Sequence, residues 1–406
     1  MKNGAVQEYG TPEEILRVLQ KLRSALTDLL LSAGLDPSAT RASARDLGLS
    51  KDVFWRVARI TLLDQILSSQ VPPRASMERV IAAIQKKGVP ENLLKKTRQA
   101  INEFEVMVES SSTNRATFDM MLSGLATDGI TERQENIRKQ AFFANSSIWG
   151  VQSQVAFKAF FLAPSESSDK IDLANLSGMV GFRRLRQVAW PVYQRRIYDD
   201  RGSAFSLAYE PYSDLPESAG GLPLFSEFCS KPLPEISWRQ GREGMFYEIQ
   251  PDLIGNAGAT SLVFGGISRR SAARYRDDSN DRGGLIYELF TPAEFVNVDM
   301  FLHRDLPYKM PPYVSIFDRL SSPRGYNPDM DERRQLPLSS RVLSLGNGIS
   351  GCSTLKIPEY LPMLERVMNK IGFDTNEFKA YRFSMKFPPI PSAIIFRFKL
   401  PEPPGN

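Results

Sequence analysis

The stretch Ala39-Thr-Arg-Ala-Ser-Ala-Arg-Asp-Leu-Gly-Leu-Ser-Lys-Asp-Val-Phe-Trp-Arg-Val-Ala-Arg-Ile60 predicts two short helices that meet at a tight turn. Ala44 has the small side chain that lets two helix backbones approach closely where they cross. Gly48 falls where the chain leaves the first helix through a left-handed conformation, which costs a residue with a Cβ about 1–2 kcal/mol. Ser50 is a preferred N-cap for the second helix. The stretch therefore predicts a helical corner.

The outer face of this corner is cationic. Phe54 and Val57, three residues apart, share the face of the second helix that packs back onto the turn. Cationic and aromatic groups on the opposite face are the ones that a helix in the major groove uses against phosphates and base edges. The candidate contact residues are Ser50, Lys51, Trp55, Arg56 and Arg59 on the second helix, with Arg41 and Arg45 toward the DNA backbone. Asp46 and Asp52 reduce the excess of positive charge, and the segment 39–60 keeps a net charge of +3.

The stretch resembles the helix-turn-helix of many bacterial transcription regulators. Their alanine, turn glycine and later apolar pair correspond to Ala44, Gly48, Phe54 and Val57. The resemblance covers residues 39–60 only, and it implies a recognition helix over about 50–60 in the major groove of double-stranded DNA. Such regulators commonly bind as symmetric dimers, so it also implies a homodimer. A plain helical corner with a solvated charged face is the alternative.

Composition bounds the remaining possibilities. The chain has 406 residues, of which 42% are apolar and 24% charged, which is enough for two or three domains. A net charge of +5 is mild, so affinity for a polyanion has to come from a local patch. Cys229 and Cys352 lack the paired spacing of zinc or redox sites and predict a reducing, cytoplasmic location. Neither a signal peptide in Met1–Gly10 nor an apolar run of about 18 residues is present, so no membrane association is expected.

The pattern along the chain predicts an α+β multidomain protein. Apolar residues recur at helical spacing from Thr11 to about Gly150, and an all-α domain is expected over 1–165. The polar stretch 165–170 marks a boundary, and residues 171–406 predict a β-rich domain, a sandwich or barrel rather than a parallel sheet. The expected helices are 77–87, 90–108, 115–125, 131–144 and, late in the chain, 358–371; the expected strands are 204–209, 245–249, 261–264, 284–290, 295–303, 379–387 and 393–400. The surplus helices either enlarge the first domain or pair two subunits.

Two further patterns concern anions and nucleotides. Four arginines follow one another closely, Arg269, Arg270, Arg274 and Arg276, and arginine forks suit phosphate or another anionic ligand. The aspartates of segment 277–281 offer an alternative, because they would neutralise this cluster within one surface loop. The segment 346–351 has the glycine spacing of a dinucleotide-binding loop, but the next helix starts too late to present its N–H groups. No cofactor is therefore expected.

The remaining chemistry is sparse. His303 is the only histidine, so sites with two histidines are excluded, and without a Gly-x-Ser-x-Gly pattern we interpret it as a structural residue at a strand end. The acidic segments 277–281 and 329–332 lack the ligand spacing of a calcium loop, and no metal site is predicted. A second basic cluster, 183–186 with 195–196, would either extend a DNA footprint or hold the domains together.

These observations rank three functions. The first is a cytoplasmic DNA-binding transcriptional regulator, whose C-terminal domain senses a small-molecule or anionic effector or binds a partner. The second is an enzyme with its active site in the β-rich domain, although the sequence contains no complete catalytic constellation. The third is a structural or assembly protein without a role on DNA. A steep salt dependence of binding would distinguish the first from the others.

Overall fold

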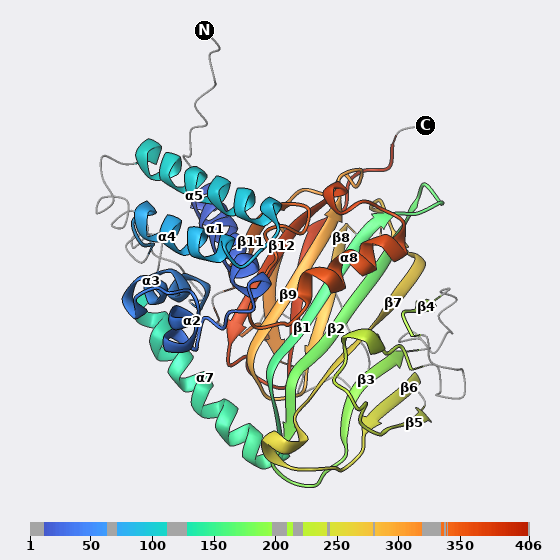
Figure 1. Cartoon of the computed structure of the whole chain (residues 1–406). Helices are drawn as coiled ribbons and strands as arrows, with labels where there is room; N and C mark the ends of the chain where they lie inside the picture. Colours follow the sequence, from blue (N-terminus) through green and yellow to red (C-terminus); the bar gives the residue numbers. More distant parts are fainter. Residues whose placement is uncertain are drawn as a thin grey trace. The chain divides into compact units, whose positions relative to one another are not determined.

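The computed structural model (Figure 1) describes residues 12–62, 71–111, 128–196, 209–213, 222–241, 244–278, 281–318, 334–336, 338 and 340–404. The chain divides into two compact units, Met1–Ile130 with Leu343–Pro362, and Thr131–Val342 with Met363–Asn406. A helical N-terminal region precedes a β-rich region, as predicted, so the fold is α+β. The predicted helix 115–125, most of the predicted strand 204–209 and the acidic segment 329–332 lie outside the described residues.

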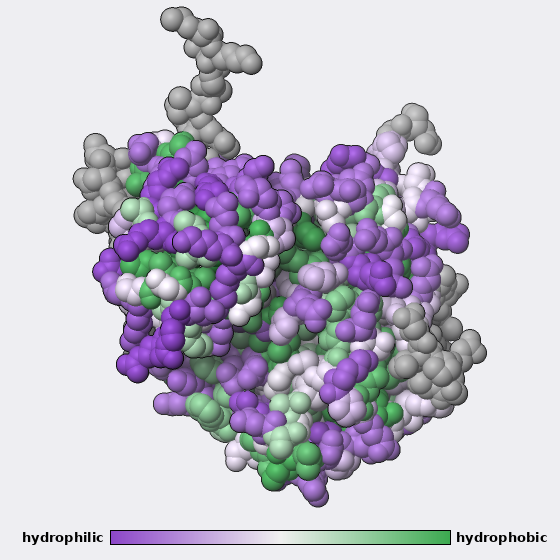
Figure 2. Space-filling model, in the orientation of Figure 1, coloured by the Kyte–Doolittle hydropathy of each residue, from purple (hydrophilic) through white to green (hydrophobic). Residues whose placement is uncertain are grey.

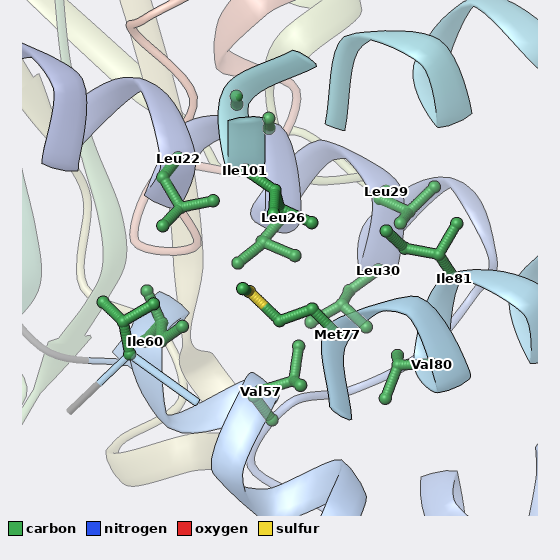
Figure 3. Close-up of a cluster of buried hydrophobic side chains, with 14 of the residues drawn as sticks. Leu22, Leu26, Leu29, Leu30, Val57, Ile60, Met77, Val80, Ile81 and Ile101 are labelled. Carbon is green, nitrogen blue, oxygen red and sulfur yellow. The ribbon is translucent and has the colours of Figure 1, made fainter. Parts of the chain in front are cut away.

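The first unit is a helical cluster joined by a short strand from late in the chain. Its elements are α1 (Pro12–Ser32), α2 (Thr40–Asp46), α3 (Lys51–Leu62), α4 (Arg74–Gln85), α5 (Glu91–Ser111) and β11 (Leu343–Asn347). Figure 3 shows how α1 supplies Leu22, Leu26, Leu29 and Leu30 to one apolar core. The other labelled members of this core are Val57, Ile60, Met77, Val80, Ile81 and Ile101, which come from α3, α4 and α5.

Polar contacts align the long helices α1 and α5 along this core. The Lys21 ammonium lies 2.7 Å from the Glu103 carboxylate, and Lys96 lies 2.6 Å from Asp28. The buried Thr97 hydroxyl donates to the Leu93 carbonyl on its own helix at 2.8 Å, so its polar atom is satisfied inside the core. The pairs fix the register of two helices whose apolar stripes alone would allow sliding.

The second unit starts at Thr131, within the helix α7 (Asp128–Trp149), and consists mainly of strands. The strands are β1 (Val151–Pro164), β2 (Lys170–Arg184), β3 (Trp190–Arg196), β4 (Tyr209–Pro211), β5 (Ile236–Gly241), β6 (Gly244–Ile249), β7 (Thr260–Ala273), β8 (Arg282–Leu289), β9 (Ala293–His303), β10 (Tyr313–Asp318), β12 (Phe378–Lys386) and β13 (Ser392–Lys399). Short 3-10 turns, η3 (Ser226–Phe228), η4 (Gly255–Gly258) and η6 (Thr375–Glu377), connect some of them. The late helix α8 (Tyr360–Ile371) crosses in front of β1 and β2 in Figure 1.

These strands form a large mixed sheet and two small sheets. In the large sheet the order within this unit is β12-β9-β1-β2-β7-β4, and the pairing of β1 with β9 is parallel while its other ladders are antiparallel. The small sheets have the orders β10-β13-β8 and β3-β6-β5. The expectation of a sandwich rather than a parallel sheet therefore missed one parallel ladder, formed by two strands buried on both faces.

One apolar core lies between the large sheet and the sheet β10-β13-β8. It includes Phe160 of β1, Val298 of β9 and Phe383 of β12 on one side, and Phe396 of β13 on the other. Side chains alternate between the faces of a strand, so the next residues of β9 and β12 point to the opposite face. There Arg382 donates to both carboxylate oxygens of the buried Asp299, at 2.8 and 2.7 Å.

The β-rich region begins earlier than the sequence pattern indicates. Strand β1 starts at Val151, directly after α7, whereas strands were expected only from residue 171. The run of apolar residues in β1 shows no clear alternation, because both of its faces are buried. The predicted strands 245–249, 261–264 and 295–303 lie inside β6, β7 and β9, and that part of the prediction is confirmed.

Candidate nucleic-acid interface

A specific hydrogen-bonded turn joins α2 to α3. The Leu49 N–H donates to the Ala44 carbonyl at 2.9 Å and the Gly48 N–H to the Arg45 carbonyl at 3.0 Å. This pair of bonds is the Schellman ending of a helix, which requires a left-handed residue just beyond the helix. Gly48 supplies it with φ of 63°, as the sequence predicts. The turn satisfies carbonyls at the end of α2 and redirects the chain within four residues.

A side chain caps the start of α3, and side-chain hydrogen bonds order the turn before α2. The Val53 N–H donates to the Ser50 hydroxyl at 3.4 Å, a long N-cap bond, and Phe54 N–H donates to the Ser50 carbonyl at 3.2 Å. Before α2, the Asp36 carboxylate accepts hydrogen bonds from the hydroxyl and the backbone N–H of Ser38, which lower the pKa of Asp36. The Ser43 hydroxyl donates to the Asp36 carbonyl at 2.8 Å. These contacts fix the approach to α2 and the first turn of α3.

The inner face of the corner belongs to the core of the first unit. Ala44, Phe54 and Val57 are buried, with 2%, 0% and 0% of their surface exposed, while Leu47 and Leu49 are partly buried against the same core. These are the inner positions that the sequence predicts. Packing on one side leaves the opposite side of both short helices in solvent.

The predicted contact residues lie on that outer face, and they differ in whether their side chains are paired with neighbouring groups. Arg41, Arg45 and Lys51 are exposed and form no ion pair with any described residue. The Arg56 guanidinium lies 2.8 Å from the Asp52 carboxylate, one helical turn earlier. The Arg59 guanidinium lies 5.2 Å from the ring centroid of Trp55, a cation–π arrangement on a ring that is 42% exposed.

One cation of this surface, Lys87, was not predicted from the sequence. Lys87, in the turn after α4, forms an ion pair with Asp46 at the end of α2 and so offsets one of the two acids on the corner. Lys86, beside it, is exposed. The sequence signal for this cation was the pair Lys86-Lys87 before Gly88 at the end of α4. The pair could not be assigned to the corner from the sequence, because only tertiary packing brings α4 close to α2. Figure 2 shows that the visible face of the first unit is mostly hydrophilic, with a smaller hydrophobic patch.

The arginine cluster after Gly266 is largely occupied by other groups of the second unit. Arg269 and Arg270 lie on strand β7, not in a surface loop. The Arg269 guanidinium contacts the carboxylates of Asp172 at 2.9 Å and Glu210 at 3.1 Å, and the Arg270 N–H donates to Asp172 at 2.9 Å. Both carboxylates hold Arg269 charged, because hydrogen bonding to them raises its pKa.

The Arg270 side chain is exposed and has no ion pair with a described residue, whereas Arg274 and Arg276 have partners. Arg274 donates to the Asp305 carbonyl at 2.6 Å, and Arg276 forms an ion pair with Glu402 near the chain end. The nearby aspartates of segment 277–281 were the expected neutralising groups, but the carboxylates paired with Arg269 and Arg276 lie further away in the sequence. Arg269, Arg274 and Arg276 therefore link parts of the second unit, and an added anion would have to displace their partners, whereas the exposed Arg270 remains accessible.

The glycine-rich segment 346–351 belongs to the first unit and faces α1. The Ser24 hydroxyl donates to the Ser350 carbonyl at 2.8 Å and accepts from the Ser353 N–H at 3.2 Å. The Gln20 amide donates to the Gly351 carbonyl at 3.4 Å. The helix α8 starts only at Tyr360, so no helix N-terminus adjoins this loop. Its geometry differs from that of a dinucleotide-binding turn, in which the loop leads directly into a helix.

His303 is a buried strand-end residue, as the sequence analysis interprets it. Its Nδ1 accepts a hydrogen bond from the Asp305 N–H at 3.2 Å, and its ring packs against Phe373 and Phe378, with centroids 4.5 and 5.3 Å away. Burial lowers the pKa of His303 because the apolar surroundings disfavour the imidazolium form. Its Nε2 lies 3.8 Å from a Glu377 oxygen. No serine hydroxyl among the described residues hydrogen-bonds to the ring.

The second basic cluster, 183–186 with 195–196, lies within the second unit, and its first three arginines form contacts there. Arg184 is 1% exposed and donates to the Val188 carbonyl at 3.2 Å, and Arg183 lies 3.1 Å from Glu294. Arg186 donates to the Ser147 carbonyl near the end of α7 at 3.2 Å. Trp190 donates to the Thr291 hydroxyl at 2.9 Å. These contacts hold α7, β2 and β3 together inside one unit.

The chain matches no protein-family model and no curated protein sequence. The site must therefore be judged on its own geometry. Among the described residues, no three side chains of histidine, cysteine, aspartate or glutamate gather as a metal site would require. Within the same part of the chain, no helix has the length and apolar character needed to cross a membrane. The exposed cationic face of α2 and α3 is the candidate functional site.

Proposed function

We propose that the first unit binds double-stranded DNA through the cationic outer face of α2 and α3. The chain then acts as a transcriptional regulator, with α3 in the major groove and the second unit as a sensor or interaction module. The observation that carries this proposal is the set of exposed cations without ion pairs to described residues, Arg41, Arg45 and Lys51, on two helices joined by a Schellman turn. Such cations reach phosphate oxygens without first breaking an ion pair.

The dimensions of α3 suit the groove. A helix of 12 residues is about 18 Å long, and the major groove is about 12 Å wide. The N-terminal residues of a recognition helix usually contact base edges, and Lys51 occupies that end of α3. The stacked Trp55 and Arg59 side chains offer an apolar surface and a guanidinium in a fixed relation, one turn further along.

The cations of this face should contribute unequally to DNA binding, because one of them is held in an ion pair and others are not. Arg56 has to leave Asp52 before it contacts a phosphate, so we expect its removal to matter less than the removal of Lys51 or Arg45. The substitution Asp52→Asn releases Arg56 and deletes a negative charge near the phosphates. This variant should bind DNA more tightly than the wild type, which a helical corner without a DNA role does not predict.

The proposal includes a homodimer, because two recognition helices related by a two-fold axis reach successive major grooves. Light scattering after gel filtration distinguishes a monomer of 45.6 kDa from an assembly of twice that mass. A monomer in the presence and absence of DNA would contradict the dimer while leaving the DNA contact itself to the binding experiment.

Fluorescence polarisation of a labelled random-sequence duplex tests the DNA contact. We expect Arg45→Ala/Lys51→Ala to lose about tenfold or more in affinity at about 0.1 M salt, because both side chains neutralise phosphates. The matched control is Arg79→Ala/Lys95→Ala, which removes two exposed cations of α4 and α5 and the same total charge. Equal affinity of both double variants would mean that only net charge matters, and the placement on α2 and α3 would be wrong.

A further inference from the structure

A row of polar side chains crosses one face of β1, β2 and β7 in the second unit. The register pairs Lys158 of β1 with Ser177 of β2, and Ser177 with Phe264 of β7. Two residues along β2, Asn175 pairs with Gly266. Directly opposed residues of neighbouring strands point to the same face. This face continues into the apolar core that β1 shares with the sheet β10-β13-β8.

Lys158 is a cation without a carboxylate partner among the described residues. Its ammonium donates to Asn175 Oδ1 at 3.0 Å and lies 5.3 Å from the ring centroid of Phe160. Burial lowers its pKa to about 8, because apolar surroundings disfavour the charged form. An ammonium carries three donors, and within the described part of the chain Asn175 is the one hydrogen-bond acceptor it contacts.

Aromatic rings and hydroxyl groups continue the row beyond Asn175. The Tyr193 ring stacks on Phe264 with centroids 5.2 Å apart, and its hydroxyl lies 3.2 Å from that of Tyr209. Gly266 admits the Tyr209 phenol, because a Cβ at this position would lie 2.6 Å from Tyr209 Cζ. The Asn175 amide donates to the Gly266 carbonyl at 3.4 Å and so links the ammonium end of the row with the phenol end.

The row remains partly open although it borders a core. Lys158, Asn175 and Ser177 each keep part of their surface exposed, whereas Ala174 and Leu176, on the other face of β2, are buried. Apolar walls with a few convergent polar groups are the usual composition of a small-molecule site. A partly buried cation that has no carboxylate partner among the described residues needs an external anion more than a surface lysine does.

We propose that this face binds a small aromatic carboxylate, with the carboxylate on the Lys158 ammonium and the ring beside the partly exposed Tyr193. The carboxylate supplies a counter-charge that the part of the chain described by the structure does not provide, and it accepts the ammonium donors that Asn175 leaves. The proposal rests on the sensor role given above to the second unit. Its test uses no DNA, so that failure of either proposal is recognised separately.

Isothermal titration calorimetry with benzoate tests the site, and benzamide, which has the same ring without the charge, is the ligand control. We expect benzoate to bind the full-length protein at least tenfold more tightly than benzamide. The substitution Lys158→Met should abolish this preference, while Lys399→Met, at an exposed lysine of β13, should retain it. Absence of benzoate binding, equal binding of the two ligands by the wild type, or an unchanged preference in Lys158→Met would each overturn the proposal.

The comparison of benzoate with benzamide is made on the wild type, so the test does not depend on the folding of a variant. The phenol end of the row is tested in the same way. Tyr209→Phe removes one hydroxyl of the Tyr193–Tyr209 pair and keeps the ring. We expect 4-hydroxybenzoate to bind the wild type more tightly than this variant, and equal binding would contradict the assignment of the ring to this end.

Discussion

The substitution Lys158→Met should stabilise the protein at neutral pH. Burial lowers the pKa of Lys158 from 10.5 to about 8, and a pKa difference of one corresponds to about 1.4 kcal/mol, so the charged form costs up to about 3 kcal/mol in the folded state. Methionine keeps a similar length without the charge. It leaves the Asn175 carbonyl oxygen without its donor, which costs about 1 kcal/mol. We therefore expect a net gain of about 2 kcal/mol in the free energy of unfolding.

The gain should depend on pH in a defined direction. Between pH 8 and 10.5 the unfolded chain still binds the lysine proton while the folded protein has released it, so the stability of the wild type rises with pH in this window. Below pH 8 the penalty is fully present, and above 10.5 it is absent. The advantage of Lys158→Met over the wild type should therefore shrink from pH 7 to pH 10.

Urea unfolding followed by far-ultraviolet circular dichroism at pH 7 and at pH 10 measures both quantities. The control Lys399→Met removes an exposed lysine and should change the stability by less than about 0.5 kcal/mol at either pH. A Lys158→Met protein that is no more stable than the wild type at pH 7, or whose gain is unchanged at pH 10, would refute the reasoning about the buried charge.

Three further predictions concern the framework. Gly48→Ala should lower the free energy of unfolding by about 1 kcal/mol, because φ is 63° but no atom lies within 4 Å of the added Cβ; a loss well above about 2 kcal/mol in urea unfolding would show that the turn is strained in another way. Arg382→Met should cost about 3–5 kcal/mol, because it removes the guanidinium that is paired with the buried Asp299 carboxylate, and thermal unfolding that matches the wild type would contradict this. Burial lowers the pKa of His303, so the neutral imidazole contributes fully to stability above the unfolded pKa of about 6.5, and this contribution is lost as the pH falls toward the folded value. The free energy of unfolding should then fall by at most about 1.4 kcal/mol per pH unit. His303→Gln should flatten this part of the stability profile, measured from about pH 7.5 to 5.

Local patterns predicted the helical corner well. Gly48 marks the turn because few other residues adopt positive φ, and the apolar spacing of Phe54 and Val57 identifies the inner face of α3. Both signals are contained within about 20 residues of sequence. The outer face was predicted only as a set of residue types, because the ion pair of Arg56 with Asp52 and the approach of Lys87 to Asp46 depend on rotamers and on tertiary packing.

In the β-rich region, contacts between residues that are distant in sequence could not be predicted. Residues 155–163 of β1 are apolar except for Lys158, a pattern that does not distinguish a strand from a buried helix segment. Its parallel partner β9 begins at Ala293, 129 residues after β1 ends at Pro164. The same difficulty hides Lys158, which looks like an ordinary surface lysine until the register places it beside Asn175. The ion pair of Arg269 with Asp172 could not be predicted either, because the two residues are distant in sequence.

The salt dependence of DNA binding tests the central claim most directly. Each phosphate contact contributes about 0.9 to the slope of the logarithm of the binding constant against the logarithm of the salt concentration. For Arg45→Ala/Lys51→Ala we predict a slope that is smaller than that of the wild type by about 1.8, since two phosphate contacts are lost. The Arg79→Ala/Lys95→Ala control should keep the wild-type slope. Identical slopes for all three proteins, or no salt-sensitive binding by the wild type, would contradict the assignment of DNA binding to α2 and α3.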